Sequence, residues 1–207
     1  MKKAHPTYAE NVFINCPFDD HYVGLFQAMV FTIHCLGLRP RCALEAVAAE
    51  NRIDKIVRII SESKYGIHDI SRTELDEEHG LPRFNMPFEL GLDLGCKAFN
   101  GEYKDKKHLM LDTEKYRYQK FLSDLSGFDP RPHSNKVGEV IQIVSDWIRS
   151  DLEQPQLPNG RQINNAFMIF ETDFVTIRGG LPDNPSFPDF SYVVAKWVEE
   201  YIKSSNS

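Results

Sequence analysis

The sequence lacks the features of membrane-spanning and exported proteins. No apolar stretch among its 207 residues approaches the roughly 18 residues that a membrane span needs. The first ten residues, MKKAHPTYAE, carry two lysines but no apolar run behind them, so no signal peptide is predicted. We therefore expect a soluble, cytoplasmic protein without a membrane partner.

Cysteine is scarce, and its spacing fits no metal site. The four cysteines form no CxxC pair; they are Cys16, Cys35, Cys42 and Cys96. We expect four buried, reduced thiols. The histidines are equally scattered along the chain, so no metal site is predicted.

Positive charge is not in excess, and two common phosphate-binding motifs are missing. The net charge is -6 at pH 7, whereas a DNA- or RNA-binding protein normally presents a basic face. Nucleic acid is therefore not an expected partner. Neither GxxxxGK(S/T) nor a GxGxxG after the first predicted strand occurs. A nucleotide that binds this chain is thus not held by a glycine-rich loop.

Short apolar runs alternate with stretches of helical period. A hydrophobic fraction of 42% suits a globular protein with a core. Ile53, Ile56, Val57 and Ile60 illustrate the helical period, since they fall at i, i+3, i+4 and i+7. Strands are predicted at 12–14, 41–44, 65–70 and 107–111, with helices at 19–37, 53–60, 85–99 and 137–148. This alternation predicts an α/β fold with a doubly wound, flavodoxin-like parallel sheet.

The pattern changes after about residue 150. The segment EQPQLPNGRQ is typical of a linker, and residues 167–177 are apolar without a clear period. A helix is predicted at 192–202. We therefore expect an α/β domain over 1–150 and a smaller, mostly helical C-terminal extension over 151–207.

Charged and aromatic residues follow several predicted strands at the point where each strand ends. In open parallel sheets, ligands bind beyond the carboxyl ends of the strands. Acidic side chains there suit ribose hydroxyls, arginines suit phosphates, and phenylalanines can stack on a base. The predicted substrate-binding residues are Phe18, Asp19, Asp20, Asp69, Arg72, Arg83, Phe84 and Asn85. Asp19 and Asp20 could equally be helix N-caps.

The stretch LPRFNMPFELGLDLGCK places Glu89 inside a predicted helix that packs on the sheet. Gly91 and Gly95 are expected to let this helix approach the sheet closely and so position Glu89 at the rim. A carboxylate there can stabilise or attack the cationic carbon that forms when an N-glycosidic bond breaks. Two interpretations of Glu89 stay open: it is a catalytic carboxylate, or its charge only stabilises the start of the helix.

Five stretches carry a resemblance to a known superfamily: VFINCPFDD, ALE, YGIHDISR, LPRFNMPFELGLDLG and FLSDLSGFDP. They resemble bacterial TIR-like proteins, within the superfamily that joins TIR domains with nucleoside 2-deoxyribosyltransferases. The resemblance to that superfamily covers about residues 12–111, which hold four of the five stretches. It implies that Glu89 is the catalytic carboxylate, that Asp19 and Asp20 lie in the substrate loop, and that Asp69 ends the third strand. The transferases' GT before the glutamate is absent here, as is the tryptophan-containing approach of TIR domains.

Two classes of function follow. The first is an enzyme, a glycosidase or a deoxyribosyltransferase-like transferase, that cleaves the N-glycosidic bond of NAD, or of a related nucleotide or nucleoside, and acts in bacterial defence. NAD would then be a substrate, and no separate cofactor is predicted. The second is a non-catalytic module that senses a nucleotide or assembles into a homo-oligomer. Free base that appears and depends on Glu89 separates the two.

Overall fold

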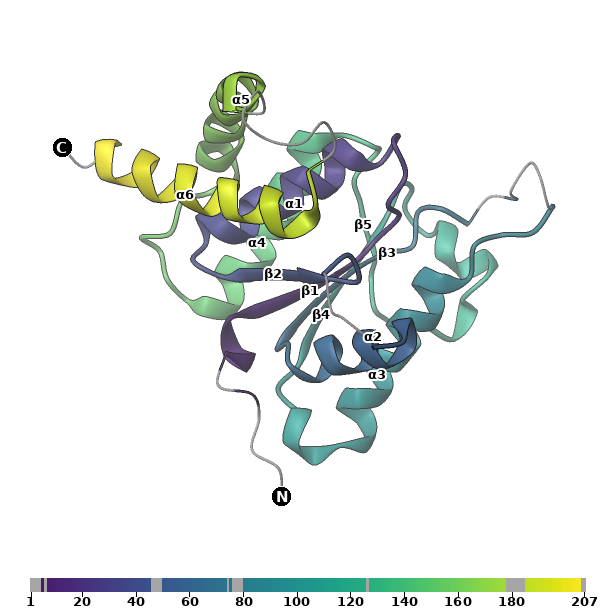
Figure 1. Cartoon of the computed structure of the whole chain (residues 1–207). Helices are drawn as coiled ribbons and strands as arrows, with labels where there is room; N and C mark the ends of the chain where they lie inside the picture. Colours follow the sequence, from purple (N-terminus) through teal and green to yellow (C-terminus); the bar gives the residue numbers. More distant parts are fainter. Residues whose placement is uncertain are drawn as a thin grey trace.

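A computed structural model describes residues 5, 7–45, 50–73, 75, 80–125, 127–177 and 185–205. Its centre is a five-stranded sheet with the order β2-β1-β3-β4-β5, and every neighbouring pair is parallel (Figure 1). The strands are β1 Asn11–Asn15, β2 Arg39–Cys42, β3 Tyr65–Asp69, β4 Lys107–Asp112 and β5 Arg131–Pro132. This is the flavodoxin-like strand order, and it confirms the predicted fold class.

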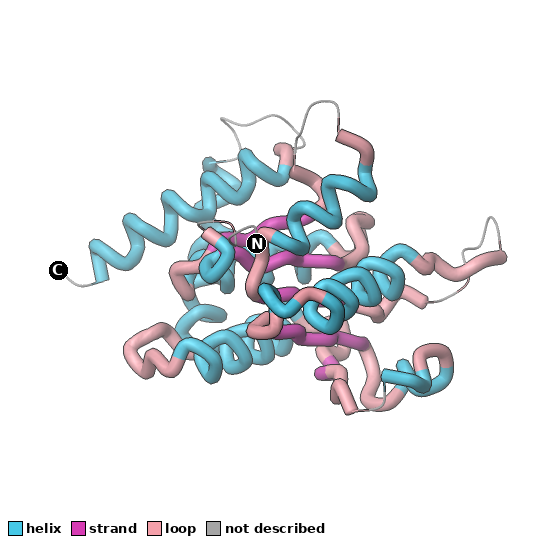
Figure 2. The backbone as a smooth tube through the Cα atoms, turned by 90° about the horizontal axis from the view of Figure 1, so that it is seen from below, coloured by secondary structure: helices cyan, strands magenta, loops and turns pink. Residues whose placement is uncertain are grey.

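Helices cover both faces of the sheet. They are α1 Val23–Cys35, α2 Arg52–Ser61, α3 Asn85–Phe99, α4 Val137–Leu152, α5 Gly160–Ile177 and α6 Phe187–Ser205. The helices α2 and α3 lie on one face, and α1 and α4 lie on the other (Figures 1 and 2). The helices α5 and α6 form an outer layer over α1 and α4. Among the described residues, four short 3-10 turns occur, at Tyr8–Glu10, Gly101–Tyr103, Arg117–Lys120 and Ser123–Leu125.

Strand β1 shows why the apolar runs predicted a covered parallel sheet. All five of its residues are buried. Val12 and Ile14 belong to the core beneath α1 and α4, while Phe13 packs with Ile56 and Ile59 of α2 on the opposite face. Successive side chains of a strand point to opposite faces of the sheet. A strand with helices on both faces therefore needs apolar residues at odd and even positions alike.

Helix α1 lies between two layers. Six consecutive residues, 28–33, are buried, so the helix is apolar on nearly all sides. Phe31 contacts the rings of Phe167 and Phe170 of α5, each at 5.2 Å between ring centroids, and that of Trp197 of α6 at 5.6 Å. The helices after residue 150 therefore share one hydrophobic core with the α/β part of the chain.

Several predicted boundaries differ from the structure. The first helix begins at Val23 rather than at Asp19–Asp20, and neither aspartate side chain caps it. The backbone oxygen of Asp19 instead accepts from the Tyr22 amide at 2.9 Å, which makes a turn before the helix. Strand β2 lies two residues earlier than predicted. Strand β5 was not predicted, because its two residues contain no apolar run.

Two further expectations concern the loops and the thiols. The predicted linker forms turns up to residue 159, where α5 then begins. The four cysteines are free; three are buried and Cys96 is half-buried. The acidic run 74–78, which suits a solvated loop or a lid, lies outside the described residues apart from Leu75.

The central position of Phe31 gives a stability prediction. Phe31→Ala should lower the free energy of unfolding by about 3–5 kcal/mol, because it opens a cavity between α1, α5 and α6. Phe99→Ala is the matched control: Phe99 is 93% exposed, and its loss should change stability by less than about 0.5 kcal/mol. Urea denaturation measures both values, and equal losses would contradict this description of the core.

Candidate active site

Helix α3 presents two carboxylates to the sheet. Its buried residues are Met86, Glu89, Leu90 and Asp93, at i, i+3, i+4 and i+7 along one stripe. Because a buried charge must be compensated or lose its ionisation, the surroundings of the two acids determine what each can do. Those surroundings differ sharply.

Asp93 is compensated within the protein. Its carboxylate lies 3.0 Å from Lys106 Nζ, 2.9 Å from His68 Nε2 and 3.4 Å from His108 Nε2. Burial alone would raise its pKa, but the contacts with His108 and His68 and the charge of Lys106 hold that pKa well below its usual range. Asp93 is therefore ionised and committed to the interior.

Glu89 has far weaker compensation. It is 4% exposed, and it forms an ion pair with Arg52 Nη2 of α2 at 4.0 Å. The Arg52 side chain is itself 60% exposed, so water weakens its field. Burial raises the pKa of Glu89 to about 7, while Arg52 acts in the opposite direction. Near neutral pH, Glu89 thus exchanges between its acid and carboxylate forms.

The end of β1 brings three predicted acids around one thiol. Burial raises the pKa of Cys16 well above its usual range, and the charges of Asp69, Glu89 and Asp19 raise it further. These acids therefore lie close enough to act on Cys16 electrostatically. The same surroundings keep the thiol protonated, which disfavours Cys16 as a nucleophile.

Asp69, at the end of β3, is fully buried and bound by protein donors. It accepts from the Tyr22 hydroxyl and from the Ser71 amide, the latter at 2.8 Å, and it lies 3.0 Å from His133 Nε2. Burial alone would raise its pKa, but His133, Ser71 and Tyr22 lower it. Asp69 thus joins the loop after β1, the loop after β3 and the segment after β5.

The loops after β1 and β3 also meet through charge. Arg72 Nη2 lies 3.5 Å from Asp19 Oδ1, and Arg83 Nη1 lies 4.0 Å from Asp19 Oδ2. The two arginine side chains are 37% and 57% exposed, so both guanidinium groups can reach a ligand. Asp20, the residue after Asp19, is exposed.

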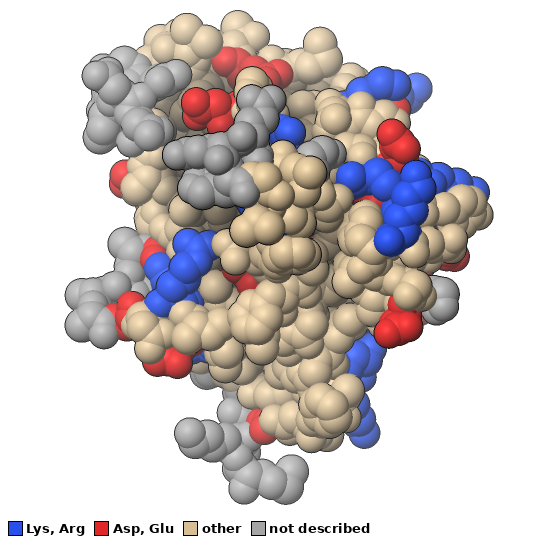
Figure 3. All heavy atoms as spheres, turned by 90° about the vertical axis from the view of Figure 1, so that its right-hand side faces the viewer, with Lys and Arg blue, Asp and Glu red and all other residues tan. Residues whose placement is uncertain are grey.

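Exposed aromatic rings lie on the elements that carry the predicted site. Phe84 is 66% exposed and Phe18 38% exposed, and Asn85 at the start of α3 is exposed as well. Phe18 packs edge-on against Phe26 of α1 at 5.3 Å between ring centroids, which supports its ring from behind. Figure 3, which faces the carboxyl edge of the sheet, shows a broad uncharged area with both basic and acidic side chains at its margins.

Four contributors to this region were not predicted: Arg52, Tyr22, Ser71 and His133. Most of them are distant in sequence from the residue that they contact. Arg52 lies 37 positions before Glu89, and His133 lies 64 positions after Asp69. The histidines carried no spacing signal, so only the strand order brings His133 to Asp69.

The predicted role of two glycines is wrong. A Cβ added to Gly91 would meet nothing within 4 Å, and one on Gly95 would contact only Phe99 of the same helix, at 3.7 Å. The close approach is made instead by Gly66 of β3. A Cβ there would overlap the Asp93 carboxylate and lie 2.7 Å from His68 Nε2. The missing side chain on the strand therefore makes room for the buried Asp93 contacts.

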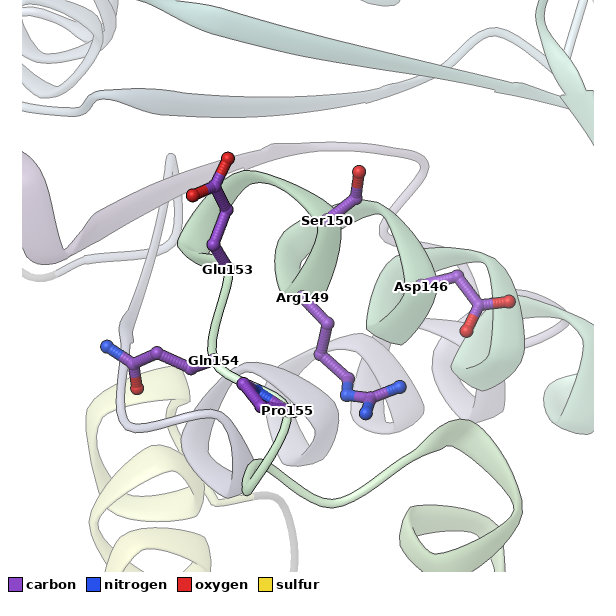
Figure 4. A pocket seen from close by; sticks show the side chains of 6 residues that line it. All are labelled: Asp146, Arg149, Ser150, Glu153, Gln154 and Pro155. Carbon is purple, nitrogen blue, oxygen red and sulfur yellow. The ribbon is translucent and has the colours of Figure 1, made fainter.

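Two cavities lie away from Glu89. One, of about 450 Å³, is lined by Asp146, Arg149, Ser150, Glu153, Gln154 and Pro155 at the end of α4 (Figure 4). In this part of α4, Asp151 contacts Lys64 and Lys107 at the amino ends of β3 and β4, so the cavity belongs to the opposite edge of the sheet. The other, of about 360 Å³, lies beside β5 and includes Tyr116 and Arg131.

The described part of the chain holds no group of three or more His, Cys, Asp or Glu side chains that could bind a metal ion. Among the described helices, none is both long and apolar enough to cross a membrane. No protein-family model, curated protein or solved structure matches this chain. The contacts, burial and charges described above are therefore the structural support for the candidate site.

The packing of Gly66 gives a second prediction. Gly66→Ala should destabilise the protein by about 2–4 kcal/mol, because the new methyl group displaces Asp93 and breaks its buried contacts. The control, Gly91→Ala, should be neutral or stabilise by up to about 1 kcal/mol, since alanine favours an exposed helix position. Urea denaturation compares them. The reverse order of stability would show that the strand glycine has no such role.

The raised pKa of Glu89 gives a third prediction, which concerns the pH dependence of stability. Its pKa is about 7 when folded and about 4.5 in the reference state, so the folded state binds more protons in between. The stability cost of Glu89 is absent below pH 4.5, grows as the pH rises to 7, and is constant above that. Glu89→Gln removes this titration. Its stability advantage over the wild type should therefore increase by about 3 kcal/mol from about pH 4.5 to about pH 8.

Urea denaturation of both proteins across this pH range measures the difference. Other titrating groups are common to the two proteins and cancel in the comparison. A difference that is the same at every pH would mean that Glu89 titrates normally.

Proposed function

We propose that this protein cleaves the N-glycosidic bond of NAD, or of a related nucleotide or nucleoside, with Glu89 as the catalytic carboxylate. The observation that carries the proposal is the environment of Glu89. Glu89 is a buried acid near the carboxyl ends of β1 and β3, and its burial raises its pKa to about 7. Buried acids with perturbed pKa values occur preferentially at functional sites.

The chemistry suits such a group. When the bond between C1′ and the base nitrogen breaks, both bonding electrons leave with the base and C1′ becomes cationic. The ionised Glu89 carboxylate can stabilise that cation, or bond to it, before water adds to C1′ and releases a proton. In NAD the departing electron pair neutralises the positive ring nitrogen, so nicotinamide leaves without protonation. Low screening around a buried carboxylate strengthens its effect on the cation.

The neighbouring residues suit the rest of a nucleotide. Arg72 and Arg83 offer guanidinium groups to phosphates, and Asp19 and Asp20 offer acceptors to ribose hydroxyls. Phe18 and Phe84 offer exposed ring faces to a base. The TIR-like and deoxyribosyltransferase-like resemblance supports the same assignment, since it implies that Glu89 is the catalytic glutamate. Depletion of NAD would give the protein a role in bacterial defence.

Turnover tests the proposal. Purified protein is incubated with NAD, NADP and a panel of nucleosides at low and high protein concentration, and chromatography measures nicotinamide or free base. Wild-type protein should release one of them, and Glu89→Gln should reduce release at least about 100-fold. The control is Glu199→Gln on α6, an acid that is 51% exposed and should not affect release.

The pH profile adds a second readout. The reaction uses ionised Glu89, so the rate should rise with pH and reach half of its maximum near pH 7. Equal release by wild type and Glu89→Gln would exclude the catalytic assignment. No release by folded wild type at any concentration would instead favour the nucleotide-sensing or assembly module.

A further inference from the structure

A buried side-chain amide of strand β1 holds the first turn of helix α3 against the sheet. The side chain of Asn15, at the carboxyl end of β1, donates from Nδ2 to the backbone oxygen of Met86 at 2.8 Å. The same Nδ2 lies 3.1 Å from His68 Nδ1 on β3. Asn15 is 2% exposed and His68 is 0% exposed, so water does not compete for either contact.

These contacts fix the proton of His68. An amide nitrogen carries two hydrogens and accepts none, so His68 Nδ1 must be the acceptor. The ring proton then lies on Nε2, which donates to Asp93 Oδ2 at 2.9 Å. A neutral ring is consistent with the lowered pKa of His68, which results from burial.

Asp93 continues the line along the same face toward the amino edge of the sheet. Its other oxygen lies 3.0 Å from Lys106 Nζ, which is fully buried. Lys106 also donates to the backbone oxygens of Ile60, at 2.7 Å, and Ser63. Hydrogen bonds and one ion pair thus connect the first turn of α3 with the end of α2.

We infer that Asn15 and His68 are positioning residues for Glu89, an inference that rests on the proposed function of Glu89. Glu89 lies on the same helical stripe as Met86, three residues earlier, and Asp93, four residues later. Asn15 of β1 holds Met86 through its backbone oxygen, and His68 of β3 holds Asp93 through its carboxylate. The helix can neither rotate nor slide without breaking a buried polar contact, so the Glu89 carboxylate stays buried.

A purely structural network would predict a different outcome, and β1 supplies the control that separates the two. Asn11, at the other end of the strand, is 1% exposed and donates from Nδ2 to the backbone oxygen of Glu62 at 2.7 Å. It matches Asn15 in residue type, burial and kind of acceptor. It differs in its place, at the amino end of the strand.

The experiment measures the pKa of Glu89 itself. Protein labelled with ¹³C at the glutamate carboxyl carbon is titrated by NMR, and Glu89→Gln assigns the resonance. Arg52 of α2 pairs with this carboxylate, the charge of Glu89 reaches the Cys16 thiol after β1, and both residues stay unchanged in every variant. Asn15→Ala should lower the pKa of Glu89 by about one unit or more, because the released helix exposes the carboxylate. Asn11→Ala should leave it unchanged, although both variants lose stability.

A second pair of variants keeps the inference testable if Asn15→Ala does not fold. His68→Gln retains an acceptor for Asn15 and a donor for Asp93, so the pKa of Glu89 should remain near the wild-type value. His68→Leu removes both and should lower it. If Asn15→Ala and Asn11→Ala leave that pKa equally unchanged, or His68→Leu does so, the network only stabilises the fold.

The titration needs no substrate, so its result is independent of the proposed activity. A lowered pKa in Asn15→Ala together with an inactive wild type would retain the positioning role and reject the catalytic one. If the wild type is active, Asn15→Ala should lower kcat more than it changes KM, since the reacting group moves while the exposed ligand contacts remain.

Discussion

The arrangement of the site depends on the buried contact between Asp93 of α3 and Lys106 before β4. Both side chains are fully buried and lie 3.0 Å apart. Removing both charges from water is costly, and loss of one partner would leave the other uncompensated, at about 3–5 kcal/mol. The pair persists because His68 and two backbone oxygens complete its hydrogen bonds. Its geometry leaves α3 a single position on the sheet, with Gly66 beneath it.

That position gives the two acids of α3 opposite properties. Asp93 faces Lys106 and His68 and stays ionised, whereas Glu89 is four residues earlier with one solvated guanidinium at 4.0 Å. Enzymes that use paired titratable groups separate their pKa values through such differences in environment. Here the fold commits one charge to structure and leaves the other adjustable near neutral pH. The second is the group from which chemistry is expected.

The sequence carried enough information for most of the fold. Residues 85–99 and 65–69 lie where apolar period and breakers predicted them, because burial on a sheet imposes those periods. Strand β5 escaped prediction, since two residues held by β4 need no apolar pattern. Asp19 and Asp20 resembled helix caps, but the turn before α1 draws Asp19 toward Arg72 and Arg83.

Within the candidate site, the sequence predicted which residues lie at the carboxyl edge of the sheet, but it did not predict which residues they contact. The strand-end rule grouped Asp19 with Arg72, and the two side chains lie 3.5 Å apart, since the rule depends only on topology. The neighbours of Asp69 and Glu89 come mostly from segments far along the chain, and no local pattern encodes them. Gly66 shows the limit most clearly: glycine in a strand signals a close approach, but the sequence does not say to what.

Under the proposed function, a nucleotide binds at the carboxyl edge of the sheet with its glycosidic carbon at Glu89. The most direct test is a crystal structure of the Glu89→Gln protein with NAD, in which slow turnover preserves the ligand. We expect C1′ of the nicotinamide riboside within about 3.5 Å of the substituted amide side chain, with the phosphates toward Arg72 and Arg83. A nucleotide bound instead in the cavity at the end of α4, far from Glu89, would contradict it.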